Sequence, residues 1–252
     1  MDRKLTALLL IGAAVLTNTA FAVLGSVFDY PDILQQPVEA ILAAFRAAQT
    51  SVMFWFAVMA LSAALLAPIA VGVGRLSTRR AMRIAVPVGI AAGVVQVIGL
   101  SRWPLLVPGF AADAASADPA VAASGREQFL LAHRLLGNLV GETLGYLLTA
   151  AWTLLVVIAL GRTLARRWFS ALGAVSALLI ATGLLSPLEL PVVDQANFAG
   201  YVLWSLWLIA FGVLLLRRAP AEPRQDVPVP SSTTVRYPAG TASTSHTPFP
   251  ER

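Results

Sequence analysis

The side chains that could carry chemistry gather near one end of the apolar runs of this chain. Arg134, Asn138 and Glu142 follow one another at intervals of four residues, at the start of a long apolar run. On an α-helix this spacing places them in one polar stripe that runs inward from the end of the run. A charge inside a membrane-spanning helix costs about 2.5–3.5 kcal/mol on insertion scales and needs a partner. The stripe is therefore the first candidate for a binding site.

A counter-charge for this stripe lies in the preceding apolar run. Counted from the opposite end at about 1.5 Å per residue, Arg102 and Glu142 both fall about 27 Å along their helices, so we expect them to pair. Glu189 reaches a similar level, and Asn197 begins the last run nearby. A plainer interpretation is that these charged groups reach to water and only anchor helix ends. The candidate binding layer comprises Arg102, Arg134, Asn138, Glu142, Glu189 and Asn197.

Catalytic and metal chemistry find few candidates. The chain has no cysteine and two histidines, His133 and His246, which excludes thiolate nucleophiles and iron–sulfur centres and disfavours a histidine-built metal or haem site. His133 and Glu142 are the one acid–base combination, but their separation along a helix is about 13.5 Å. We predict no catalytic residue, no metal and no cofactor.

Six apolar runs must position these side chains. Each has about the 20 residues that a helix needs to cross roughly 30 Å of hydrocarbon. Hydrophobic residues make up 58% of the chain and charged residues 12%, which is typical of a polytopic membrane protein. The predicted fold class is all-α, a transmembrane bundle of six helices. The runs are approximately 5–28, 51–73, 84–106, 135–160, 169–190 and 198–216.

The loops between these runs alternate in charge. Arginine and lysine gather at 3–4, 75–83, 162–167 and 217–218, whereas the other loops carry the acids. Positive loops mark the cytoplasmic side, so we expect both termini in the cytoplasm of a bacterium, the bundle in its inner membrane and the polar layer outside. The net charge of +5 is then an orientation signal, and no nucleic-acid partner is predicted.

Glycine recurs at every fourth residue of the fourth run. Gly137, Gly141 and Gly145 lie on one helix face, and bare backbone there allows close approach of another helix. Gly89 and Gly93 of the third run are a possible counterpart. We interpret all five as packing residues. Whether the contact lies within one chain or between subunits is open, and so is the oligomeric state.

The connecting segments carry signals of their own. Apolar residues at helical spacing between Leu34 and Phe45 predict a short amphipathic helix on the outer surface. Ser124 and Glu127 have the spacing of a capping box, so the fourth helix is expected to begin about ten residues above the membrane. Residues 219–252 hold seven prolines and nine serines or threonines. We predict that they form a disordered cytoplasmic tail beyond a six-span domain of residues 1–218.

The first run allows two interpretations. Arg3 and Lys4, an apolar stretch and Ala20-Phe21-Ala22 also match a secretory signal peptide with a cleavage site. We favour a retained helix, because the apolar run continues to Phe28 and reaches a membrane-spanning length.

Three motifs invite a comparison with known proteins. They are Gly99-Leu-Ser-Arg-Trp-Pro104, Gly141-Glu-Thr-Leu-Gly-Tyr146 and Gly200-Tyr-x-x-Trp204-x-x-Trp207. Together they resemble an uncharacterised bacterial family of six-span integral membrane proteins, over roughly residues 5–217. The resemblance implies a six-helix fold in a bacterial inner membrane. It brings no reaction, cofactor or catalytic residue.

Two classes of function fit these observations. The first is a non-enzymatic membrane protein that binds a lipid, a small ligand or a membrane-protein partner through its outer polar layer. The alternative is a small-molecule transporter or a membrane-embedded enzyme that uses Arg102, Glu142 and Glu189. No ionisable side chain lies in the cytoplasmic two-thirds of any run, which weighs against an ion-coupled carrier. We therefore favour the binding protein.

Overall fold

The computed structural model describes residues 2–161, 164, 167–188 and 190–217. Within these ranges the chain is helical and contains no β-strand. Six helical stretches are long and apolar enough to cross a membrane, which confirms the predicted fold class. Glu189 and the predicted tail, residues 219–252, lie outside the described residues. The stretches are Arg3–Phe28, Gln49–Gly74, Arg80–Asp113, Pro119–Leu160, Arg167–Leu188 and Val192–Arg217.

The helices follow one another with short connections. The first part of the chain comprises α1 (Arg3–Phe28), η1 (Asp32–Gln35), α2 (Val38–Ala47), α3 (Gln49–Ala64) and α4 (Leu66–Gly74). The middle part comprises α5 (Arg80–Leu105), α6 (Val107–Asp113), α7 (Pro119–Ala132), the π-helix η2 (His133–Leu144) and α8 (Gly145–Leu160). The last part comprises α9 (Arg167–Thr182), η3 (Gly183–Leu188) and α10 (Pro191–Arg217).

Two prolines explain the breaks inside the second and third stretches. Pro68 has no backbone N–H to donate to the carbonyl of Ala64, and α3 ends at that residue. Pro108 likewise has no backbone N–H to donate to the carbonyl of Pro104. In this stretch α5 ends at Leu105 and α6 begins at Val107. In both stretches the helix resumes after the break, so the apolar length needed to cross a membrane is kept.

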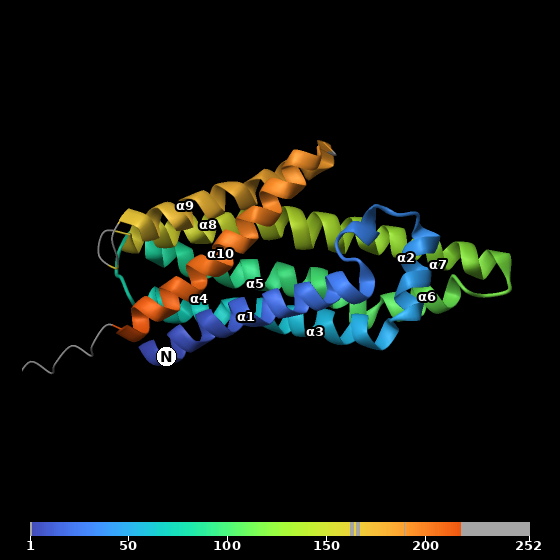
Figure 1. The fold of residues 1–252 in the computed structure, drawn as a ribbon, viewed down its shortest axis with the longest axis horizontal. Helices are drawn as coiled ribbons and strands as arrows, with labels where there is room; N and C mark the ends of the chain where they lie inside the picture. Colours follow the sequence, from blue (N-terminus) through green and yellow to red (C-terminus); the bar gives the residue numbers. More distant parts are fainter. Residues whose placement is uncertain (1, 162–163, 165–166, 189, 218–252) are drawn as a thin grey trace, which may run out of the picture. The chain divides into compact units, whose positions relative to one another are not determined.

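The long helices form one bundle, with α2, α6 and α7 gathered at one end (Figure 1). α5 packs against α3, α4, η2 and α8, and α10 packs against α1 and α9. We call the end that holds the N-terminus the basic end and the end that holds α2, α6 and α7 the distal end. Positively charged residues at the basic end include Arg3, Lys4, Arg75, Arg79, Arg80, Arg83 and Arg217.

The predicted amphipathic helix is confirmed as α2, but its apolar face packs on protein rather than along a membrane surface. Ile41, Leu42 and Phe45 are all buried in an apolar cluster. α2 packs against α6 and α7, and the centroid of the Phe45 ring lies 6.0 Å from that of Trp103 in α5. The hydrophobic pattern therefore marks an internal face of the distal end.

Polar contacts fasten α2 to the same two helices. Arg46 donates from Nη1 to the carbonyl oxygen of Ala111 in α6, over 3.1 Å. Glu39 forms an ion pair with Arg126 of α7, with 3.5 Å between the carboxylate oxygen and Nε. These contacts and the buried face join α2, α6 and α7 into one layer, which we call the distal layer.

The fourth helical stretch begins earlier than the capping-box pattern predicts. α7 starts at Pro119, and the Asp118 carboxylate caps it by accepting from the backbone N–H of Ala120 at 2.8 Å. Aspartate followed by proline suits the N-cap and first helical position, so this earlier pair begins the helix. Ser124 lies inside the helix, where its hydroxyl accepts a hydrogen bond from the Gln128 amide at 3.0 Å. The predicted cap at Ser124 was wrong.

Two large apolar clusters and a small third one around Ile180 fill the bundle, and each of the two large clusters has a fully buried tryptophan among its rings. The distal cluster surrounds Trp103, whose ring stacks on that of Phe56 with centroids 4.8 Å apart. The basal cluster, nearer the basic end, surrounds Trp207, whose ring stacks on that of Phe169 with centroids 5.3 Å apart. The candidate site borders the distal cluster.

Candidate functional site

Arg102 is the central charged group of the candidate site. Its side chain is 5% exposed and lies with Cζ 5.4 Å from the centroid of the Trp103 ring. Nη1 donates to the carbonyl oxygen of Gly99, one turn earlier in α5, at 2.5 Å. Nε has no hydrogen-bond partner among the described residues. A buried cation in this state has an open donor and a desolvation cost that its own helix only partly offsets.

A close contact between α5 and η2 holds the guanidinium in place. A Cβ atom on Gly99 would lie 2.6 Å from the Cα of Gly141, so the two backbones cross without side chains between them. A Cβ atom on Gly137 would lie 2.8 Å from Nη2 of Arg102. Glycine at these positions is what gives the guanidinium its space, because any side chain would displace it. The contact lies within one chain.

The segment opposite Arg102 is π-helical over all 12 residues from His133 to Leu144. The hydroxyl of Thr143 donates to the carbonyl oxygen of Asn138, five residues earlier, at 2.9 Å. π-helical segments are rare, usually a single turn long and frequent at functional sites. A run of this length beside a buried arginine is therefore the strongest local departure from regular structure in the described chain.

The ion pair expected between Arg102 and Glu142 is not formed. Within the described residues the one ion pair shorter than 4 Å joins Arg126 to Glu39. Arg102 instead contacts Gly137, five residues before Glu142. The depth argument compared levels along the helix axes, and the path from Leu160 back to Glu142 is α-helical except for its last three residues. Equal level does not fix the direction in which a side chain points around its helix, and it is Gly137 that faces the guanidinium. Glu142 is half-buried and stays within electrostatic range of the guanidinium.

Tyr30 enters the site from a segment that the sequence did not single out. α1 ends at Phe28, and Asp29 adopts the left-handed conformation (φ 54°) that commonly ends a helix. The Tyr30 ring then packs edge-on against Phe21 and Phe56, with centroids 5.6 Å and 5.2 Å away. The turn after α1 thus returns the chain to the distal cluster.

The electrostatics of Tyr30 connect it with both charged groups. Burial raises the pKa of the Tyr30 hydroxyl to about 12; the Glu142 carboxylate also raises it, and the Arg102 guanidinium lowers it. The hydroxyl is therefore uncharged at neutral pH. It is available as a neutral hydrogen-bonding group close to one cation and one carboxylate.

The other predicted site residues do not converge on Arg102. Arg134 and Asn138 are exposed on η2. Asn197 is buried, and its amide donates to the carbonyl oxygen of Ile180 at 2.8 Å, which joins α10 to α9. The structure therefore divides the predicted layer into a site around Arg102, an exposed pair and a helix-packing amide. Glu189 lies outside the described residues.

The remaining predicted packing glycines meet several different helices. Gly89 faces Trp152 of α8 and Ala70 of α4, and Gly93 faces the carbonyl of Ala63 in α3. Neither meets the glycines of the fourth stretch, for which Gly99 is the counterpart in α5. Gly145 faces the side chain of Gln96.

His133 does not form an acid–base pair with Glu142. Its imidazole stacks on the Phe129 ring with centroids 5.8 Å apart and planes 8° apart. Nδ1 has no hydrogen-bond partner among the described residues. Those residues also hold no group of three or more His, Cys, Asp or Glu side chains arranged for a metal ion.

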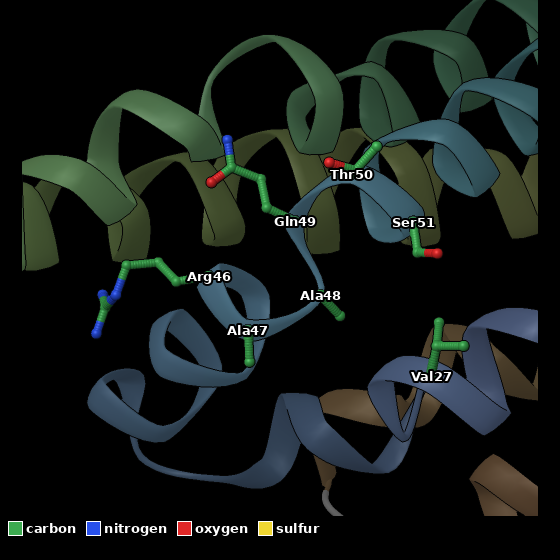
Figure 2. A pocket seen from close by; sticks show the side chains of 7 residues that line it. All are labelled: Val27, Arg46, Ala47, Ala48, Gln49, Thr50 and Ser51. Atoms are coloured by element: carbon green, nitrogen blue, oxygen red, sulfur yellow. The ribbon is translucent and has the colours of Figure 1, made fainter.

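A pocket of about 390 Å³ lies where α2 meets α3, beside the end of α1 (Figure 2). Arg46 is its charged lining residue, but Figure 2 shows this side chain directed away from Val27. Its Nη1 donates to the backbone of Ala111. The arginine of this pocket therefore supports the distal layer.

Sequence reasoning missed three features of this site. Tyr30 follows a predicted span and carries no periodic signal, and Gly99 lacks a second glycine four residues away. The π-helical register of η2 depends on hydrogen bonds that no residue pattern specifies. The Tyr30-Pro31 pair directly after a span end is the one available signal, since it indicates a turn.

The family described as Domain of unknown function (DUF4386) matches residues 5–212. No curated protein and no solved structure matches.

Proposed function

The chain belongs to the DUF4386 family, and from this premise we propose that it is a non-enzymatic binding protein of a bacterial inner membrane. Both termini are cytoplasmic in this proposal, and the distal end with its polar site faces outward. The alternation of basic and acidic loops supports the orientation. The site around Arg102 supports the binding role.

The observation that carries the proposal is the open Nε of a guanidinium that is 5% exposed. A buried polar group without a partner destabilises a protein, and a ligand with an acceptor oxygen would remove that cost on binding. Arginine also offers several donors in a fixed plane, which suits carboxylate and phosphate groups. We propose that the ligand presents such a group to Arg102.

The side chains around Arg102 indicate which other chemical groups the ligand would carry. The Trp103 ring lies beside the guanidinium, and the Tyr30 hydroxyl lies within electrostatic reach of it. The half-buried Glu142 carboxylate is a hydrogen-bond acceptor for a hydroxyl or amine group. A small molecule or lipid with one anionic group, one donor group and an apolar body fits this combination.

Native mass spectrometry of the protein in mild detergent tests the proposal. Wild-type protein should retain a bound small molecule or lipid, and Arg102→Met should lose it, because methionine fills similar space without donors. Arg134→Gln is the matched control, since it removes an exposed arginine nearby and should keep the adduct. Equal adducts in all three proteins, or none in the wild type, would contradict the proposal.

The alternative is a small-molecule transporter or membrane-embedded enzyme built on Arg102, Glu142 and Glu189. The π-helical η2 supports it, because π segments often accompany function and can change register. Uptake or turnover of the identified ligand in proteoliposomes, abolished by Glu142→Gln, would favour it. Binding without uptake or turnover would favour the binding protein.

A further inference from the structure

A second polar cavity lies at the basic end, far along the chain from the site around Arg102. It has a volume of about 600 Å³ and is lined by the start of α1, the loop between α4 and α5, and the ends of α8 and α10. Neither Arg102 nor any residue of η2 lines it. Any ligand here would be independent of the proposed function.

Three arginines line this cavity, and none of its described lining residues carries a carboxylate. Arg75 and Arg79 come from the α4–α5 loop, and Arg3 comes from the first turn of α1. Nε of Arg3 donates to the carbonyl oxygen of Leu215 at 3.1 Å, which fixes its position at the wall. Positive charge from two distant segments therefore meets at one cavity.

The backbone adds positive potential at the same place. α5 is 26 residues long and starts at Arg80, with Arg79 as its N-cap residue and no side chain capping it. The N-terminus of a helix carries a partial positive charge and unsatisfied N–H groups, which favour anions. The hydroxyls of Ser77 and Thr78 also line the cavity and add hydrogen-bonding groups.

The other wall of the cavity is apolar. Leu160, Leu164 and Leu215 line it and are buried. A free inorganic anion gains no stabilisation from contact with apolar side chains. A lipid does, because it carries glycerol and acyl carbons next to its phosphate. The cavity also lies where spanning helices end, which is the level of lipid headgroups in a membrane.

We infer that this cavity binds a phosphate group, with an anionic membrane lipid as the source that the apolar wall favours. The guanidinium groups of Arg75 and Arg79 bind the phosphate oxygens, Arg3 adds charge, and the leucines contact the lipid body. The preference for positively charged loops on the cytoplasmic side explains why arginines gather in this loop. It does not require them to surround a cavity together with Arg3.

Lipid titration followed by native mass spectrometry tests this inference, with phosphatidylglycerol as the probe. We expect Arg75→Gln combined with Arg79→Gln to weaken binding at least about tenfold, because each variant residue loses its charge-assisted hydrogen bonds to the phosphate. Arg80→Gln combined with Arg83→Gln is the matched control, with the same loss of charge in residues that do not line the cavity. It should change binding less than about twofold.

Further variants and competitors make the result decisive. Arg79→Lys keeps the positive charge but not the planar guanidinium, so it should give an intermediate loss of lipid affinity. This milder variant remains informative if the double variant fails to fold. Excess inorganic phosphate can be added as a competitor. If it displaces the lipid from the wild type but not from the double variant of Arg75 and Arg79, the site binds phosphate from either source. If phosphate has no effect, the site is specific for the lipid. Equal weakening in the two double variants would overturn the inference.

Discussion

The distal and basal clusters are built alike but differ in what they bury. In each, a fully buried tryptophan contacts several aromatic rings, and its indole Nε1 has no hydrogen-bond partner among the described residues. The basal cluster places its polar contacts between helices, as where Trp204 donates from Nε1 to the Thr153 hydroxyl at 2.8 Å. The distal cluster instead borders a buried guanidinium with an open donor.

This difference separates features that hold the helices together from features that helix packing does not explain. Ring packing and paired hydroxyls are sufficient to hold helices together, as the basal cluster demonstrates. Nothing in helix packing requires an arginine at Arg102 or a π-helix opposite it. The buried guanidinium of Arg102 and its open Nε are the features that the proposed binding role accounts for.

The largest expected effect tests whether the two clusters are equivalent as packing units. Trp103→Ala and Trp207→Ala should each lower the free energy of unfolding by about 3–5 kcal/mol, because each leaves a large cavity. Denaturant unfolding in detergent measures this, with Trp168→Ala as the control at a side chain that is 47% exposed. A loss below about 1 kcal/mol for either core variant would show that its cluster is not structural.

A smaller effect is expected where α5 crosses η2. Gly99→Ala should cost about 1–3 kcal/mol, because its new Cβ would meet the Gly141 backbone, which cannot rotate away. Gly12→Ala is the control, since nothing lies within 4 Å of its added Cβ. That change should be neutral or stabilising by up to about 1 kcal/mol. Similar stabilities for the two variants would mean that the crossing is not tightly packed.

The smallest effect concerns Tyr30 and is confined to alkaline pH. Its pKa is raised to about 12 from a usual value of 10, so the folded state favours the neutral hydroxyl. The resulting stability is fully present below pH 10 and is lost as the pH rises towards 12. Tyr30→Phe should therefore show a smaller fall in its unfolding midpoint between pH 10 and 12 than the wild type. Matching alkaline profiles would place Tyr30 outside the buried site.

The positions of the six helical stretches could be predicted because local apolar runs specify them. The break at Pro68 and the helix start at Pro119 also have local causes. The start was nevertheless predicted too late in the chain, because the capping-box pattern at Ser124 indicates a later cap. The site was harder to predict. Its depth argument failed at Glu142 because depth along a helix does not fix which side chains face one another across two helices.

The partners of the glycines show a second limit. Spacing correctly placed Gly137 and Gly141 on a helix face, but only the crossing geometry selects Gly99 rather than Gly89 or Gly93. Tyr30 depends on a turn that folds the chain back, which is again a tertiary property. Sequence could identify Arg102 as unusual, and the structure was needed to find its neighbours.

The fourth stretch has a mechanical consequence. Its 42 residues from Pro119 to Leu160 run to roughly 60 Å at about 1.5 Å per residue, about twice the thickness of a hydrocarbon core, so a bilayer would cover only part of its length. The ion pair between Glu39 and Arg126 joins α2 to the α7 part of this stretch. Regular α-helix on both sides is stiff, whereas η2 between them is a compliant joint, because helices bend at π-helical segments. Gly99 and Gly141 meet backbone to backbone at this segment, so any bend of η2 would change a contact that no side chain separates.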